Sequence, residues 1–261
     1  MTTSYTTERY AMSGTNMSAS KRTASAILAV VLGVSVVAGV GFTLKSASAD
    51  PSPKLAASTG DGTIDINGKS YKKAALTLGV YPGPEEAMKY DGIHINKKEW
   101  VQYSVSHIVL PKNTYVTFTI HGYDGGETLN NTYFNKVVGT VGNVVSYDGV
   151  NQSSVPCDLA VENGCKVQHT FTIHGLPTRS QKPWFVNVPL LKVEEDDNGF
   201  VPTTNAETHN AGHTMTFSVL TPDTGGEYVW NCQFPCGDGT YGKFGAAMSA
   251  YGYMSGKVTV A

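Results

Sequence analysis

Short segments in which apolar and polar residues alternate recur along most of this chain, and they limit its possible folds more than any other feature. Alternation is typical of a strand with one buried face. Turn signals such as Asn67-Gly68 separate these segments. We therefore predict an all-β fold, an antiparallel sandwich or barrel. The clearest segments are WVQYSVSHIVL from Trp100, TYVTFTIHG from Thr114, KVQHTFTIHGL from Lys166, HTMTFSVLTP from His213, GEYVWNC from Gly226 and MSGKVTV from Met254.

The composition agrees with a β-rich fold and narrows the function. Glycine (28) and tyrosine (14) are plentiful, which favours sheet and turns. Only PEEAMKY, residues 84–90, is compatible with one or two helical turns. A formal net charge of -2 gives no electrostatic basis for binding nucleic acid. The chain has no G-x-S-x-G, H-E-x-x-H or Walker sequence, so we expect it not to be an enzyme.

The N-terminal region contains one long apolar segment. A polar tail, residues 1–22, ends in Lys21-Arg22, and an uncharged run follows from Thr23 to Leu44. Small residues at Ala47 and Ala49 form an A-x-A cleavage signal, so residues 23–49 read as a secretory signal peptide. The run also has the length needed to span a bilayer, so an uncleaved anchor, residues 23–44, is the alternative. Both interpretations place the remainder of the chain outside the cytoplasm.

The exported part consists of a linker, residues 50–60, and one domain, residues 61–261, with an insertion at about 123–165 that shows no clear period. Its four cysteines form two close pairs. Disulfides persist outside the cell, so we predict that Cys157 and Cys165 are bonded. Cys232 and Cys236 are either metal-binding thiolates or a second local disulfide, because sequence alone does not choose between pairings.

Three stretches together resemble the cupredoxins, which are small copper-binding β-sandwiches. LPKNTYVTFTIHGYD is similar to the strand before the first copper ligand, and KVQHTFTIHGL to the strand that carries a ligand histidine. The third stretch runs from GEYVWNCQFPCG to GYMSGKVTV and is similar to the closing ligand loop. Its two cysteines with three residues between them resemble subunit II of haem–copper oxidases. The resemblance implies a cupredoxin-like Greek-key β-sandwich.

The resemblance also implies a copper site made of His169, Cys232, Cys236 and Met254. Soft thiolate and imidazole ligands bind copper in both oxidation states, and a thioether tunes its potential. The chain departs from the pattern because no histidine lies between Cys232 and Met254. Three outcomes stay open: these four residues bind copper, with Met248 as an alternate thioether; another histidine completes the site; or the site is degenerate and its cysteines are oxidised. The candidate histidines are His107, His121, His174, His209 and His213.

These features lead to three functional hypotheses. The first is an exported or membrane-tethered copper protein that transfers single electrons to a redox partner, such as a membrane oxidase or another carrier. The second is a copper-free extracellular module that binds partners or associates with itself through its strand edges. The third is a Cu(I) chaperone or sequestering protein, which uses thiolate and thioether ligands without a second histidine.

Overall fold

The computed structural model describes residues 18–47, 54–95, 99–125, 132–160, 164–175, 178–193, 212–234, 236 and 246–261. The chain forms two units, Met1–Ala49 and Asp50–Ala261. The first unit contains helix α1 (Ala19–Ala47). The large apolar side chains of α1 that the structure describes are exposed, and the helix is long and apolar enough to cross a membrane.

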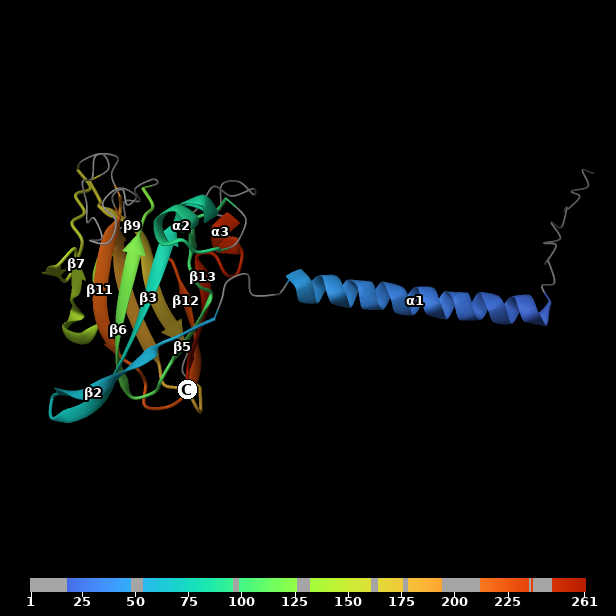
Figure 1. Ribbon diagram of the computed structural model, residues 1–261, viewed down its shortest axis with the longest axis horizontal. Coiled ribbons are helices and arrows are strands. Elements are labelled where there is room, and N and C mark those ends of the chain that lie inside the picture. Colours follow the sequence, from blue (N-terminus) through green and yellow to red (C-terminus); the bar gives the residue numbers. More distant parts are fainter. Residues whose placement is uncertain are drawn as a thin grey trace, which may run out of the picture. The chain divides into compact units, whose positions relative to one another are not determined.

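The second unit is a β-sandwich, as the alternating segments predict (Figure 1). One sheet has the strand order β1-β5-β13-β12-β9-β10 and the other β2-β3-β6-β11-β7-β8, with β4 paired to β3. The first sheet comprises β1 (Lys54–Ala56), β5 (His107–Leu110), β9 (Val167–Gly175), β10 (Trp184–Leu191), β12 (Gly226–Asn231) and β13 (Ser255–Val260). The second comprises β2 (Ser58–Ile66), β3 (Lys69–Tyr81), β4 (Gln102–Tyr103), β6 (Thr114–Gly122), β7 (Val145–Tyr147), β8 (Val150–Gln152) and β11 (His213–Leu220).

The core lies between the sheets and explains the alternation. In β6 every second residue from Thr114 onward is buried. Phe118 of β6 stacks on Phe217 of β11 with ring centroids 5.1 Å apart, and Phe171 of β9 reaches Phe118 from the opposite sheet at 5.5 Å. Burial of each such ring stabilises the fold by about 2 to 3 kcal/mol. These contacts hold β9 firmly, and β9 carries one of the candidate metal ligands.

The antiparallel prediction is correct for most strand pairs and wrong for three. β1 and β5, β5 and β13, and β3 and β6 pair in parallel. Alternation within a strand reports burial, not the direction of its neighbour. In this fold the chain crosses repeatedly from one sheet to the other, and such crossovers allow strands to pair in the same direction. The predicted hairpin is confirmed, because Asn67 and Gly68 join β2 to β3 with φ of 51° and 78°.

The structure assigns strands to two segments for which the sequence predicts no secondary structure. Residues 50–60 are predicted to be a linker, but Lys54–Ala56 form β1 and β2 begins at Ser58. Leu55 supplies the apolar contact that attaches this edge, since it packs against the core. The predicted insertion contains the 3₁₀ turn η1 (Val141–Asn143) and the two strands β7 and β8, which extend the second sheet beside β11.

Two further helices belong to the second unit. α2 (Pro84–Asp91) begins with proline, carries acidic residues in its first turn and ends at Gly92 with φ 65°. It packs on the end of β3 through a small cluster that contains Tyr81, Ala87 and Tyr123. The four-residue helix α3 (Ala246–Ser249) precedes the last strand. In Figure 1, α2 and α3 lie at the same end of the sandwich.

Candidate metal centre

His169, Cys232 and Cys236 come together because β9 and β12 are antiparallel neighbours. Asn231, the last residue of β12, pairs with Thr172 of β9. The chain after Asn231 therefore runs alongside the beginning of β9, where His169 lies. A hydrogen bond of 2.8 Å from the backbone N–H of Gln233 to Oγ1 of Thr170 holds this turn against the strand.

The three side chains form a compact buried group. Nδ1 of His169 lies 3.0 Å from Sγ of Cys236 and 3.9 Å from Sγ of Cys232. The two sulfur atoms are 3.1 Å apart, and both cysteines are free thiols. All three ligand atoms lie within 4.8 Å of one another. The structure thus brings together three of the four residues for which the sequence predicts copper binding, with their donor atoms facing one another.

Cys232 is surrounded by hydrogen-bond donors. Its sulfur accepts the backbone N–H of Thr170 at 3.3 Å and that of Phe234 at 3.4 Å. Burial alone would raise the pKa of Cys232, but the hydrogen bonds from Cys236 and His169 and the nearby imidazole lower it well below 9.0. Cys232 is therefore the thiolate of the pair.

The pKa values of Cys236 and His169 are both raised, as expected beside a thiolate. The hydrogen bond to Cys232, together with burial, raises the pKa of the Cys236 thiol well above 9.0. Burial would lower the pKa of His169, but hydrogen bonds to Asp124 and Cys232 and their charges raise it to about 9. These directions favour one thiolate, one thiol and a protonated imidazole in the metal-free group. Metal ligation requires the neutral imidazole, so binding releases protons.

Asp124 is a functional neighbour that sequence reasoning missed. Its Oδ2 lies 2.7 Å from Nε2 of His169 and also accepts a hydrogen bond of 2.8 Å from Nε2 of Gln168. Asp124 ends the stretch LPKNTYVTFTIHGYD, just after β6. A single acidic residue that follows a strand carries no distinctive signal, so only the folded chain identifies its partner.

Met254, the predicted thioether ligand, lies next to the group, and a backbone hydrogen bond links it to Cys232. Met254 is fully buried, and its carbonyl accepts a hydrogen bond of 2.9 Å from the N–H of Cys232. Met248 is half-buried and packs against the core. Tyr251 occupies the position of the histidine in the oxidase-type motif, and 48% of its surface is exposed. Coordination by either methionine therefore stays a prediction.

None of the alternative histidines that the structure describes joins this group, and each contacts a different partner. His107 and His121 contact the hydroxyls of Thr259 and Thr214 respectively. His174 is exposed near the end of β9 and contacts Asn231, whereas His169 is buried. His213 begins β11, at the start of a segment predicted to be a strand, and contacts Asp148 at 2.7 Å. His209 lies outside the described residues.

The donor set fits a copper ion. Two sulfur atoms and an imidazole nitrogen are soft and borderline ligands, which suit copper and zinc rather than magnesium or calcium. In a tetrahedral site, bonds of about 2.3 Å to sulfur and about 2.0 Å to nitrogen place sulfur and nitrogen about 3.5 Å apart and two sulfurs about 3.8 Å apart. The observed sulfur–nitrogen separations of 3.0 and 3.9 Å bracket the first value, and the sulfur–sulfur separation of 3.1 Å is shorter than the second. Small side-chain movements would therefore be enough to enclose an ion.

The second cysteine pair has a different environment. Cys157 and Cys165 are joined by a disulfide within the predicted insertion, and they also form an isolated β-bridge.

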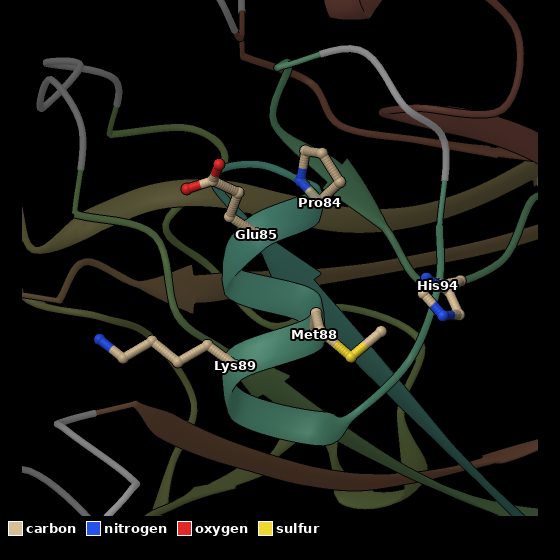
Figure 2. Close-up of a pocket in the computed structure, with 5 residues that line it drawn as sticks. All are labelled: Pro84, Glu85, Met88, Lys89 and His94. Atoms are coloured by element: carbon tan, nitrogen blue, oxygen red, sulfur yellow. The ribbon is translucent and has the colours of Figure 1, made fainter.

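A surface pocket elsewhere in the domain is unrelated to the cysteines. It lies along α2, and its lining residues are Pro84, Glu85, Met88, Lys89 and His94 (Figure 2). No member of the buried donor group lines it.

The structure can be compared with solved proteins. No protein-family model and no curated protein matches the chain. It is similar to auracyanin B at 12% identity, over 78% of this chain and 98% of that one, with a TM-score of 0.30. It is similar to rusticyanin from Thiobacillus ferrooxidans at 12% identity, over 72% and 77% of the two chains, with a TM-score of 0.29. Another rusticyanin structure, described as that of a copper protein, matches at 13% identity, over 72% and 78%, with a TM-score of 0.29. At TM-scores this low the likeness carries no weight for the site, whose assignment rests on the geometry of this chain.

Proposed function

We propose that this chain is an exported or membrane-tethered, cupredoxin-like copper protein that transfers one electron at a time. The observation that carries the proposal is the buried group of His169, Cys232 and Cys236, whose donor atoms lie within 4.8 Å of one another. His169, Cys232 and Cys236 would bind the ion, and the thioether of Met254 would approach it weakly. When bound, copper supplies a one-electron couple between its two oxidation states.

The residues of the chain would keep the site nearly unchanged during electron transfer. β9 and β12 fix the backbone on either side, and the aromatic core holds β9 in place. The two backbone N–H groups on Cys232 stabilise negative charge on its sulfur. Burial excludes water from the sulfur atoms. A site that is already ordered needs little rearrangement when the charge changes.

The electron would pass to or from a redox partner protein on the extracytoplasmic side, such as a membrane oxidase or another carrier. Helix α1 supports this location, because an apolar helix near the N-terminus acts as a signal or an anchor. If α1 is retained, the carrier stays close to a membrane partner. If it is cleaved after Ala49, the carrier diffuses.

A second function, the handling of Cu(I) by a chaperone or sequestering protein, is favoured by one specific observation. The described donor group has two sulfur atoms and one imidazole, and sulfur-rich sites prefer Cu(I). Such a site binds copper without visible colour, because Cu(I) has a filled d shell. An electron carrier is coloured when oxidised, so the two functions differ in one spectrum.

The experiment uses the full chain in detergent, reduced mildly and loaded with Cu(II). We expect one copper per chain and a strong visible thiolate-to-copper band that Cys232→Ser abolishes. The matched control is the double variant Cys157→Ser, Cys165→Ser, which removes the other cysteine pair and should keep the band. Bound copper without colour would favour Cu(I) handling. No copper and no free thiols would mean that Cys232 and Cys236 form a disulfide and that the sandwich is a structural or binding module.

A further inference from the structure

Asp124 is held so that its carboxylate faces the far side of the His169 ring from the two sulfur atoms. Its backbone carbonyl accepts a hydrogen bond of 3.1 Å from the N–H of Val193, just after β10. Gly125 allows the backbone after β6 to lie close to the backbone after β10, because a Cβ at this position would lie 2.5 Å from the carbonyl oxygen of Val193. Gln168 holds the same Oδ2 that contacts His169. The side chain of Asp124 is only 14% exposed.

This arrangement determines which imidazole nitrogen can bind a metal. An ionised carboxylate only accepts hydrogen bonds, so Nε2 of His169 must carry a hydrogen to bond Oδ2 at 2.7 Å. In a neutral ring the lone pair is then on Nδ1, which faces Cys236 at 3.0 Å. With the opposite tautomer, Nδ1 would carry the hydrogen and could not ligate a metal.

We propose that Asp124 is a positioning residue that fixes the orientation and tautomer of His169, so that Nδ1 is presented to a copper ion shared with Cys232 and Cys236. The inference rests on the proposed function and adds a residue that the ligand motif does not contain. Outer carboxylates that hold a ligand histidine typically change metal affinity 10- to 100-fold. Asp124 would have this effect without contacting the ion.

The test measures the affinity of the full chain in detergent for Cu(I), in competition with a chelator. We expect Asp124→Ala to weaken binding by about 10- to 100-fold. Asp124→Asn keeps an oxygen that accepts the Nε2 hydrogen, so its affinity should lie between those of Asp124→Ala and the unaltered chain. This rescue by the conservative variant distinguishes positioning from a general loss of packing, and it keeps the inference testable if Asp124→Ala does not fold.

The chain offers a matched control in a second aspartate–histidine pair. Asp148 contacts His213 at the same distance of 2.7 Å, outside the donor group. Asp148→Ala should leave the affinity for Cu(I) unchanged. A second readout is nitrogen NMR of the Cu(I)-loaded protein. We expect a His169 Nε2–H that is protected from exchange in the unaltered chain and not in Asp124→Ala.

Several results would overturn the inference. Equal Cu(I) affinities for Asp124→Ala and the unaltered chain would exclude a positioning role and leave the proposed function standing. Coordination through Nε2 instead of Nδ1 in the NMR spectrum would also exclude it. Colourless copper binding with the expected order of affinities would support the role of Asp124 while arguing against electron transfer. No Cu(I) binding by the unaltered chain would overturn both proposals.

Discussion

Cys232 and Cys236 are only four residues apart, yet their surroundings give them different chemistry. The sulfur of Cys232 accepts two backbone N–H groups, whereas the sulfur of Cys236 donates to Cys232 or to the carbonyl of Phe234 at 3.3 Å. Backbone donors favour a charged sulfur, and a carbonyl acceptor favours a protonated one. The same local turn therefore favours one thiolate and one thiol, and copper would have to displace the proton of Cys236 as well as the proton on Nδ1 of His169.

Gly256 shows how closely the last strand approaches its neighbours. A Cβ at this position would overlap the carbonyl oxygen of Ser106 and would lie 2.6 Å from Nε1 of Trp230. We expect Gly256→Ala to lower the free energy of unfolding by about 3 kcal/mol, because the neighbouring backbone cannot move aside without disturbing the core. Urea unfolding followed by tryptophan fluorescence measures the change.

The control for this prediction is Gly60→Ala in β2. A Cβ there would meet only Lys73, at 3.9 Å, which is an ordinary contact. Its free energy of unfolding should stay within about 1 kcal/mol of that of the unaltered chain. Similar losses for both variants would show that Gly256 is not unusually crowded.

At the scale of elements, the insertion is attached to both sheets and tied by a disulfide. β7 and β8 extend one sheet, and an isolated bridge joins Val138 to Asn187 of the other. The disulfide Cys157–Cys165 closes a ring of about nine residues, which in the chain-entropy model stabilises the fold by about 2.5 kcal/mol. We expect the double serine variant to lose this amount in urea unfolding and to keep its copper stoichiometry. A loss of copper binding would mean that the insertion shapes the metal site.

We expect the turn between β7 and β8 to make the stability of the domain depend on pH. Asp148 lies in this turn and bonds both Nδ1 of His213 and the backbone N–H of Thr214. Burial would raise the pKa of Asp148, but these bonds lower it below 3.8. A depressed carboxyl pKa stabilises the fold above the unfolded value and loses this effect as the pH falls through the folded value.

The corresponding variant is Asp148→Asn. We expect it to be less stable than the unaltered chain at pH 7, with a difference that narrows as the pH falls from the unfolded value of 3.8 towards the folded pKa of Asp148. Urea midpoints at pH 7 and in a series down to pH 3 measure the difference. A gap between the two proteins that stays constant over this range would show that the carboxylate charge does not contribute.

For the molecule as a whole, alternation and turn residues were enough to predict the sandwich but not its pairing. The stretch from Thr114 to Gly122 alternates in burial as its residues indicate, and Asn67-Gly68 forms the expected hairpin. Parallel neighbours could not be predicted, since burial does not encode strand direction. β1 could not be predicted, because a three-residue edge strand has too few positions to show an alternating pattern. The contact between Asp124 and His169 could not be predicted, because the two residues are 45 positions apart in the sequence.

If helix α1 directs export as proposed, it also sets the redox environment of the four cysteines. The apolar part of α1, Ala19–Thr43, has 25 residues and at 1.5 Å per residue is about 38 Å long, enough for a hydrocarbon core of about 30 Å. In the structure Cys157 and Cys165 form a disulfide, while Cys232 and Cys236 are not bonded to each other, and a persistent disulfide is typical of a chain outside the cytoplasm.

If α1 is the segment that directs export, a chain that lacks residues 19–43 should stay in the reducing interior of the cell. Both proteins are trapped by acid quench and then unfolded in a maleimide label at neutral pH, where thiolates react. We expect four thiols to react in the chain that lacks α1, against two in the exported protein. The mass of the exported protein shows whether α1 is cleaved. A chain that begins at Asp50 has lost α1, and an intact chain has kept it as an anchor. Export without α1, or two reactive thiols in the retained chain, would contradict this role of α1. Four protected cysteines in the exported protein would instead point to a second disulfide and to a site that cannot bind copper until it is reduced.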